Sequence, residues 1–214
     1  MFLSKLALNP RSRQARRELA DPYQLHRTVL AAFPDEAEGG LGRVSFRVDT
    51  DRCTGLSTVL VQSAAAPDWS GLRAAGDYLL ADPESKEFAP SFQRGRQLFF
   101  RLRANPTVKR EGKRHAWLRE EDQVAWLQRK ARGEGKNSRP AGFEVLSVRV
   151  VPEGVRRGRK GNGPDRRDLS LFSVLFEGIL AVTDPDAFHD TLVQGIGSGK
   201  AFGFGLLSLA RVPA

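Results

Sequence analysis

The stretch that decides the fold lies near the C-terminal end of the sequence and reads Gly195-Ile196-Gly197-Ser198-Gly199-Lys200-Ala201-Phe202-Gly203-Phe204-Gly205. Its five glycines exclude the interior of a helix, because each glycine there costs about 1 kcal/mol relative to alanine. Glycine also adopts positive φ angles freely and lets a ligand or another backbone segment come close. The run is therefore a loop, and the elements that it connects define the architecture.

A nucleotide-binding loop is one interpretation of this run, since the motif Gly-x-x-x-x-Gly-Lys-Ser/Thr binds phosphates. Two features argue against it. Ala201 follows Lys200, so no hydroxyl is available for a magnesium ion. The run also follows an expected helix and precedes an expected last strand, which is the reverse of the nucleotide-binding order. We expect no nucleotide cofactor and no other cofactor.

The rest of the chain shows the order strand, helix, strand, strand, helix, strand twice. Aspartate followed by proline marks two helix starts, at Asp21 and Asp184, because aspartate caps a helix and proline fits its first turn. Alternating polar and apolar residues mark half-buried strands, as in Arg43–Val48. The expected strands are 2–8, 43–48, 57–63 and 77–80, then 97–104, 143–151, 169–182 and 206–212. The expected helices are 21–32, 68–72, 120–132 and 184–194.

This order predicts an α+β protein of two tandem ferredoxin-like (RRM-like, βαββαβ) domains. The N-terminal domain is expected to span residues 1–82 and the C-terminal domain residues 96–214. Prolines and a glycine in the stretch 83–95 indicate a linker between them. The length of 214 residues suits two compact domains of about 100 residues each.

The charge balance indicates a polyanionic partner. The net charge is +9 and the isoelectric point is about 10.3, which favours nucleic acid or an anionic membrane surface. No apolar run approaches the ~18 residues of a membrane-spanning helix, and no secretory signal is visible, so we expect no membrane partner. The single cysteine, Cys53, excludes an internal disulfide framework. We expect a cytoplasmic protein that faces RNA or DNA.

Basic residues gather in three stretches. The first contains Arg11, Arg13, Arg16, Arg17 and Arg27, and the second contains Arg101, Arg103, Lys109, Arg110, Lys113, Arg114 and His115. The third contains Arg156, Arg157, Arg159, Lys160, Arg166 and Arg167 and lies between two expected strands, where a hairpin tip would project. A solvated loop is the alternative for each stretch. Three such stretches in one chain favour phosphate contacts to nucleic acid.

The candidate chemistry lies on the expected helix after Asp21. The three histidines, His26, His115 and His189, are far apart in the sequence and form no ligand pair, so no metal site is expected. Tyr23 and His26 are three residues apart and share a helix face. Histidine exchanges protons near neutral pH, and tyrosine or arginine stabilises phosphate charge. The alternative is that Tyr23 packs inward and His26 is an ordinary surface residue.

Several motifs together resemble the CasE family, the repeat-RNA endoribonucleases of CRISPR Cascade complexes. The chain begins with a strand, Asn9-Pro10, an arginine-rich turn and Asp21-Pro-Tyr-Gln-Leu-His-Arg-Thr28. Further matching segments are Val59-Leu-Val-Gln-Ser63, Pro67-Asp-Trp-Ser70, Phe100-Arg-Leu-Arg-Ala-Asn-Pro106, Val174-Leu-Phe-Glu-Gly178 and Gly199-Lys-Ala-Phe-Gly-Phe-Gly-Leu-Leu207. The resemblance covers essentially the whole chain in the same order.

The resemblance implies metal-independent cleavage of precursor CRISPR RNA at the 3′ side of a repeat stem-loop, leaving a 2′,3′-cyclic phosphate. The partners that it implies are the repeat RNA and the other Cascade subunits. Tyr23 and His26 match the catalytic pair, with Arg27 as a phosphate contact. The basic segment 156–167 matches an RNA-gripping hairpin. Arg11, Arg13, Arg103 and Lys200 complete the expected RNA contacts, and Gly195, Gly197, Gly199, Gly203 and Gly205 form the expected glycine-rich loop.

Two other functions stay open from the sequence. The basic stretches are equally compatible with a non-catalytic RNA-binding subunit of a ribonucleoprotein complex. A nucleotide-binding protein that uses the glycine run is the third hypothesis. In tandem ferredoxin-like domains the run would link the last helix to the last strand, and we expect it to lie near the Tyr23–His26 helix.

Overall fold

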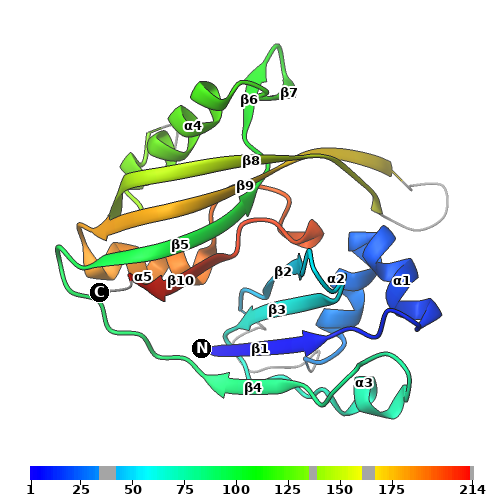
Figure 1. Ribbon diagram of the computed structural model, residues 1–214. Helices are drawn as coiled ribbons and strands as arrows, with labels where there is room; N and C mark the ends of the chain where they lie inside the picture. Colours follow the sequence, from blue (N-terminus) through cyan, green and yellow to red (C-terminus); the bar gives the residue numbers. More distant parts are fainter. Residues whose placement is uncertain (34–41, 135–138, 161–166, 213–214) are drawn as a thin grey trace. The chain divides into compact units, whose positions relative to one another are not determined.

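The structure is a computed structural model that describes residues 1–33, 42–134, 139–160 and 167–212 (Figure 1). Contacts between residues divide the chain into two compact units. Unit 1 comprises Met1–Ala89 with the segments Arg157–Leu169 and Lys200–Gly203. Unit 2 comprises Pro90–Arg156, Ser170–Gly199 and Phe204–Ala214. Two short segments from the second half of the chain thus belong to unit 1.

Unit 1 is built on a four-stranded antiparallel sheet. Its strands are β1 (Phe2–Ala7), β2 (Ser45–Thr50), β3 (Ser57–Ser63) and β4 (Glu84–Glu87), in the order β2-β3-β1-β4. The first and third strands lie in the centre, and Leu6 pairs with Val59 across them. This strand order is the one expected of a βαββαβ chain.

The described residues of unit 1 include the α-helices α1 (Arg13–Ala20), α2 (Pro22–Leu30) and α3 (Ser70–Ala74). The sequence predicts a basic loop or a short helical turn at residues 11–17, and the structure has a longer helix there, capped by the Ser12 hydroxyl, which accepts from the Ala15 N–H. The core is one cluster of buried side chains, with Leu25 and Val29 of α2 packed among residues of β1, β2 and β3. This packing fixes which face of α2 is turned away from the core.

Unit 2 repeats the architecture. Its strands are β5 (Gln97–Ala104), β8 (Phe143–Lys160), β9 (Arg167–Val182) and β10 (Leu207–Arg211), in the order β10-β5-β9-β8. The helices are α4 (Glu120–Arg132) and α5 (Pro185–Gln194). Trp126 of α4 stacks on Phe176 of β9 with ring centroids 6.0 Å apart, and Phe188 of α5 meets Phe143 of β8 edge-on at 5.7 Å. The prediction of two tandem ferredoxin-like folds is confirmed.

Several elements differ from the expectation. The last strand of unit 1 was expected at 77–80 but lies at Glu84–Glu87, within the stretch expected to be a linker. All four of its residues are exposed and pair with β1 through the main chain, so no hydrophobic pattern marks them. Leu79 makes only an isolated bridge with Leu8. Strands β8 and β9 are longer than expected, and a 3-10 turn, η2 (Lys200–Phe202), lies inside the glycine run.

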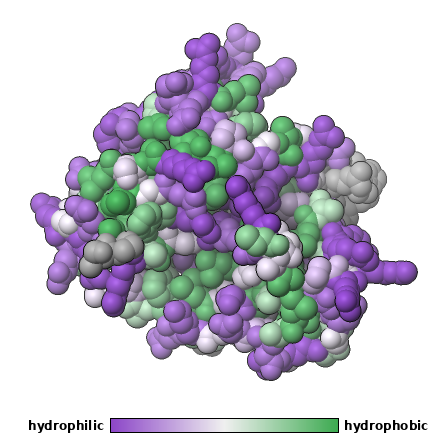
Figure 2. All heavy atoms as spheres, viewed as in Figure 1, coloured by the Kyte–Doolittle hydropathy of each residue, from purple (hydrophilic) through white to green (hydrophobic). Residues whose placement is uncertain are grey.

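A small hairpin of β6 (Thr107–Arg110) and β7 (Lys113–Ala116) was not expected. It turns through Glu111 and Gly112, both at positive φ, within the second basic stretch. Hydrophilic side chains cover much of the face seen in Figure 2, as the charged fraction of 28% requires. Among the described residues, the helices include none that is long and apolar enough to cross a membrane.

Candidate active site

Two features of helix α2 determine where Tyr23 and His26 lie: the cap at its N-terminus and the side chains that it buries in the core. The Asp21 carboxylate accepts from the Tyr23 N–H at 3.3 Å, and Pro22 occupies the first turn. Leu25 is 1% exposed and belongs to the core. Tyr23 and His26 lie on the remaining face and are half-buried. Their ring centroids are 6.1 Å apart with an interplanar angle of 44°.

Two further aromatic rings flank this pair. Phe202 of η2 stacks on Tyr23 at 6.0 Å and 29°. Phe46 of β2 stacks on His26 at 6.0 Å and 17°. We call Phe202, Tyr23, His26 and Phe46 the aromatic row. Its two outer rings are buried and its two inner rings keep partial access to solvent, so the row restricts the orientation of the His26 imidazole while leaving it partly accessible.

Glycines make this packing possible. A Cβ added at Gly203, whose φ is +78°, would lie 3.2 Å from Phe46 Cε2. A Cβ added at Gly158 would lie 2.4 Å from Phe202 Cε1. The structure thus brings the Lys200–Gly203 part of the glycine run against α2 and β2, all within unit 1.

The other expected loop glycines have roles in unit 2. Gly195 ends α5, and its N–H donates to the Thr191 carbonyl. Gly197 and Gly199 are close to Trp126 and to Phe204, respectively. The Gly205 N–H donates to the Arg103 carbonyl at 2.8 Å. All five expected loop glycines have positive φ angles, which explains why this residue type recurs.

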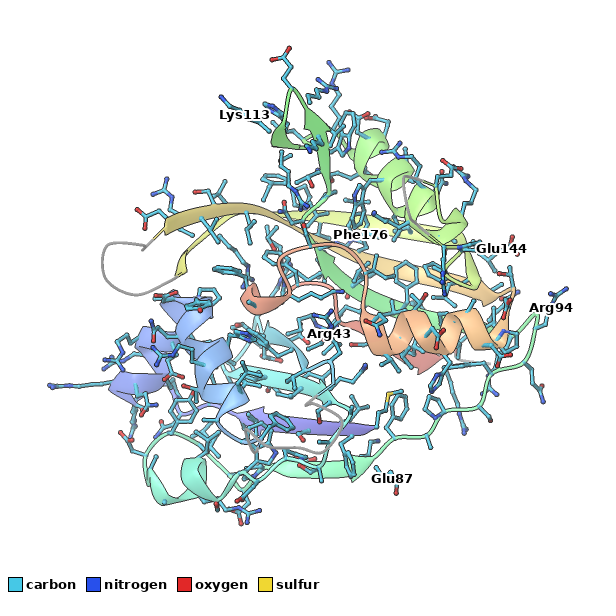
Figure 3. All side chains as sticks on the ribbon, turned by 180° about the vertical axis from the view of Figure 1, so that it is seen from behind. Arg43, Glu87, Arg94, Lys113, Glu144 and Phe176 are labelled. Atoms are coloured by element: carbon cyan, nitrogen blue, oxygen red, sulfur yellow. The ribbon has the colours of Figure 1, made fainter. Side chains whose placement is uncertain are left out.

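Unit 1 carries several cationic side chains on α2 and on the segments that contact it or precede its strands. Burial, and secondly the positive charge of Arg43, lower the pKa of Lys200 below its ordinary value. Figure 3 labels Arg43, which precedes β2. Arg27 of α2 is exposed, as are Arg11 and Arg13 at the start of α1. The repulsion between a half-buried cation and a neighbouring cation is relieved by an anion, so Lys200 and Arg43 suit a phosphate.

Arg103 lies on β5 of unit 2 and has an acidic partner in the same unit. Arg103 is 5% exposed and forms a two-fold ion pair with Glu153, at 2.6 and 2.7 Å. Ser173 donates to the same carboxylate, and Arg156 lies 3.7 Å from it. Burial raises the pKa of Glu153, but the hydrogen bonds from Arg103 and Ser173, together with the charges of Arg103 and Arg156, outweigh burial and hold the pKa below its usual value. The guanidinium of Arg103 is therefore engaged within unit 2.

The third basic stretch is described only in part. Arg156 and Arg157 lie on β8, and Arg157 is exposed. The side chains of Arg159, Lys160, Arg166 and Arg167 lie outside the described part of the structure. The expected RNA contacts of these four residues stay a prediction.

The part of the second basic stretch from Lys109 to His115 lies in the β6–β7 hairpin, where like charges face each other. Lys109 pairs with Arg114, and Arg110 pairs with Lys113. All four are exposed, and Lys113 projects outward in Figure 3. Like charges directly opposite destabilise a strand pair. Because such pairs are relieved by an anion, the hairpin suits a phosphate backbone.

Sequence reasoning missed Phe46, Phe202, Arg43 and Gly158. Phe46 alternates with polar neighbours and so indicates only a buried strand position, while Phe202 lies inside the glycine run itself. Their relation to Tyr23 and His26 depends on contacts between distant segments. In the described ranges, His, Cys, Asp and Glu side chains form no group of three or more that could hold a metal ion.

Comparison with known proteins gives consistent matches over the whole chain. Residues 1–211 match the family described as CRISPR associated protein. The chain is 40% identical over 216 residues to the CRISPR-associated endoribonuclease Cse3 of Thermus thermophilus, covering 98% of this chain and 100% of that one. It is 33% identical over 226 residues to the CRISPR system Cascade subunit CasE of Escherichia coli, covering 98% and 99%. A structure of CRISPR endoribonuclease Cse3 bound to 19 nt RNA superposes with a TM-score of 0.85, at 38% identity, over 99% of this chain and 100% of that chain.

Proposed function

The chain belongs to the family of CRISPR-associated proteins, and from this premise we infer that it is an endoribonuclease that cleaves precursor CRISPR RNA within the repeat. The observation that carries this function is the 40% identity, over the full length, to a relative named as a CRISPR-associated endoribonuclease. The protein binds the repeat stem-loop and cuts at its 3′ side. The mature guide RNA stays bound, and the protein acts with the other Cascade subunits.

The proposed reaction uses a nucleophile that RNA supplies, the ribose 2′-hydroxyl next to the scissile phosphate. The 2′-oxygen attacks phosphorus, the bond to the 5′-oxygen breaks, and a 2′,3′-cyclic phosphate forms. One proton leaves the 2′-hydroxyl and one reaches the 5′-oxygen. His26 transfers a proton at one of these two positions, since imidazole gives and accepts protons near neutral pH.

The other residues of the site orient the reacting groups. Tyr23 lies beside His26 and is held by its stacking on Phe202. Its hydroxyl can donate to a phosphate oxygen. Lys200, Arg43 and Arg27 stabilise the negative charge that grows on the phosphate in the transition state. None of these roles requires a metal ion.

We also propose that the protein works in the cytoplasm. Its substrate is a cellular transcript. The single cysteine, Cys53, is exposed and free, which suits a reducing compartment.

The proposed chemistry is tested with His26→Ala and with an RNA oligonucleotide of the host's CRISPR repeat. Loss of the proton-transfer group lowers the single-turnover cleavage rate by at least about 100-fold, while the Kd for the repeat RNA stays near the parental value. His189→Ala is the matched control, because His189 is exposed on α5. It should cleave at the parental rate.

EDTA separates the proposed mechanism from its alternatives. The parent should give a discrete product in EDTA, since the RNA supplies the nucleophile and the His26 side chain transfers the proton, and neither needs a metal ion. Binding without cleavage would identify a non-catalytic RNA-binding subunit. A requirement for Mg²⁺ would refute the metal-independent mechanism, and undiminished cleavage by His26→Ala would refute the assignment of His26.

A further inference from the structure

A buried carboxylate lies behind the helix that carries Tyr23 and His26. Glu18 of α1 is 3% exposed, and glutamate is almost never so buried without partners. Its Oε1 accepts from Gln14 Nε2 and from Thr28 Oγ1, both at 2.9 Å. Its Oε2 accepts from Tyr78 Oη at 2.6 Å. All three donors are neutral, and the proposed reaction uses none of these four side chains.

The donors come from three different parts of unit 1. Gln14 lies one turn before Glu18 on α1, and Thr28 lies on α2. Tyr78 is 1% exposed, and its carbonyl accepts from the Asn9 N–H at the end of β1. Burial, then the hydrogen bond to Glu18 and the charge of Glu18, raise the pKa of Tyr78 above its usual value, so its hydroxyl stays a donor. The carboxylate therefore ties α1, α2 and the segment at Tyr78 together.

The hydrogen bond from Thr28 to Glu18 gives α2 a directional contact, which apolar packing does not give. Leu25 and Val29 bury α2 against the core, but the hydrophobic effect is non-directional. A hydrogen bond to a charged acceptor is directional and stronger than a neutral one. Thr28 is two residues after His26 on the same short helix, so it fixes the rotation and the axial position of α2. Those two variables set where Tyr23 and His26 lie in the aromatic row.

We propose that Glu18 is a positioning residue for RNA cleavage, and that its hydrogen bonds to Thr28 and Tyr78 hold α2 in the geometry that the reaction needs. This inference rests on the proposed function, since the geometry in question is that of Tyr23 and His26. Misplacement of a reacting group by about 1 Å costs up to about 100-fold in rate. Substrate affinity depends mainly on the basic stretches and does not share this sensitivity.

The test removes one donor without changing the shape of the side chain. Thr28→Val replaces the hydroxyl by a methyl group and should slow single-turnover cleavage of saturating repeat RNA about 10- to 100-fold, with the Kd unchanged. Thr28→Ser keeps the donor and should restore most of the parental rate. Thr50→Val is the matched control, because Thr50 bonds Ser57 at 3.0 Å in an exposed part of unit 1. It should cleave like the parent.

Glu18→Gln gives an independent variant of the same network, since an amide cannot accept from all three donors. It should also lower the rate with the Kd unchanged. Parental rates for both Thr28→Val and Glu18→Gln would overturn the inference. Equal losses for Thr28→Val and Thr28→Ser would also overturn it, because they would show that the hydroxyl is not what matters.

Hydrogen exchange distinguishes this inference from the proposed function. Amides of α2 should exchange faster in Thr28→Val than in the parent or in Thr50→Val, without RNA present. If the parent failed to cleave repeat RNA, the proposed function would fail, while the exchange rates would still decide whether the network holds α2. Unchanged exchange would show that it does not.

Discussion

At Gly158 the aromatic row depends on the absence of a side chain. An added Cβ would lie 2.4 Å from Phe202 Cε1, and no positive φ strains this residue. Gly158→Ala should therefore displace Phe202 and remove the stacking partner of Tyr23. Overpacking of this kind lowers the unfolding free energy by about 1–3 kcal/mol. We expect a single-turnover cleavage rate about 10-fold lower, measured with saturating repeat RNA well below the melting temperature.

Gly71→Ala is the control for this substitution. Gly71 also lacks a positive φ, and its added Cβ would meet nothing within 4 Å. It should keep both the parental rate and the parental stability. Equal rates for Gly158→Ala and the parent would show that Phe202 does not need to lie against Tyr23 during cleavage.

The sequence predicts the residues of the site that share one helix and misses those that come from elsewhere. Tyr23 and His26 are three residues apart, and helical periodicity alone places them on one face. Phe46 and Phe202 meet them from a strand and a 3-10 turn, and Gly158 of β8 adjoins Phe202. The sequence also does not reveal the carboxylate that pairs with Arg103, whose RNA contact stays a prediction. Glu153 lies 50 residues away in the chain.

At the scale of elements, the helices and strands with strong local sequence signals could be predicted, and those with weak signals could not. The Asp-Pro starts of α2 and α5 and the apolar alternation of β5 predicted these elements. Strand β4 has the sequence Glu-Ser-Lys-Glu and owes its existence to main-chain pairing with β1. The β6–β7 hairpin did carry a turn signal, Glu111-Gly112, but its charged strands have no hydrophobic face.

This hairpin gives a prediction in which stability and binding move in opposite directions. Arg114→Glu replaces a like-charge pair with Lys109 by an opposite-charge pair. The exchange is worth roughly 0.2–1 kcal/mol within the hairpin. RNA affinity should nevertheless fall, since one cation is lost and an anion is gained beside the phosphates. Urea denaturation measures the first effect and a filter-binding Kd for the repeat RNA measures the second.

Arg73→Glu provides the comparison for the change in net charge. Arg73 lies on α3 of unit 1, outside the three basic stretches. It should weaken binding much less than Arg114→Glu. Unchanged affinity in Arg114→Glu would assign the hairpin a role other than RNA contact.

At the scale of the whole molecule, the charge indicates the class of partner, and the aromatic row indicates the chemistry. The excess of nine positive charges predicted a polyanionic partner from composition alone. Composition could not predict that two segments from the second half of the chain, Arg157–Leu169 and Lys200–Gly203, complete unit 1. Periodicity describes neighbours along the chain, whereas these contacts arise only when the elements pack.

Binding and chemistry should therefore respond differently to salt. Each phosphate that the protein neutralises adds about 0.7–0.9 to the slope of log K against log salt concentration. The Kd for the repeat RNA should rise steeply as KCl is raised from low to physiological concentration. The cleavage rate of the saturated complex should change less, because Tyr23, His26 and Lys200 are half-buried, and only Arg27 and Arg43 of the proposed site are exposed to competing ions. A titration of Kd and a single-turnover assay at saturating RNA, each over the same KCl series, measure the two slopes, and a rate that falls in parallel with the affinity would place salt-sensitive charge in the reacting centre itself.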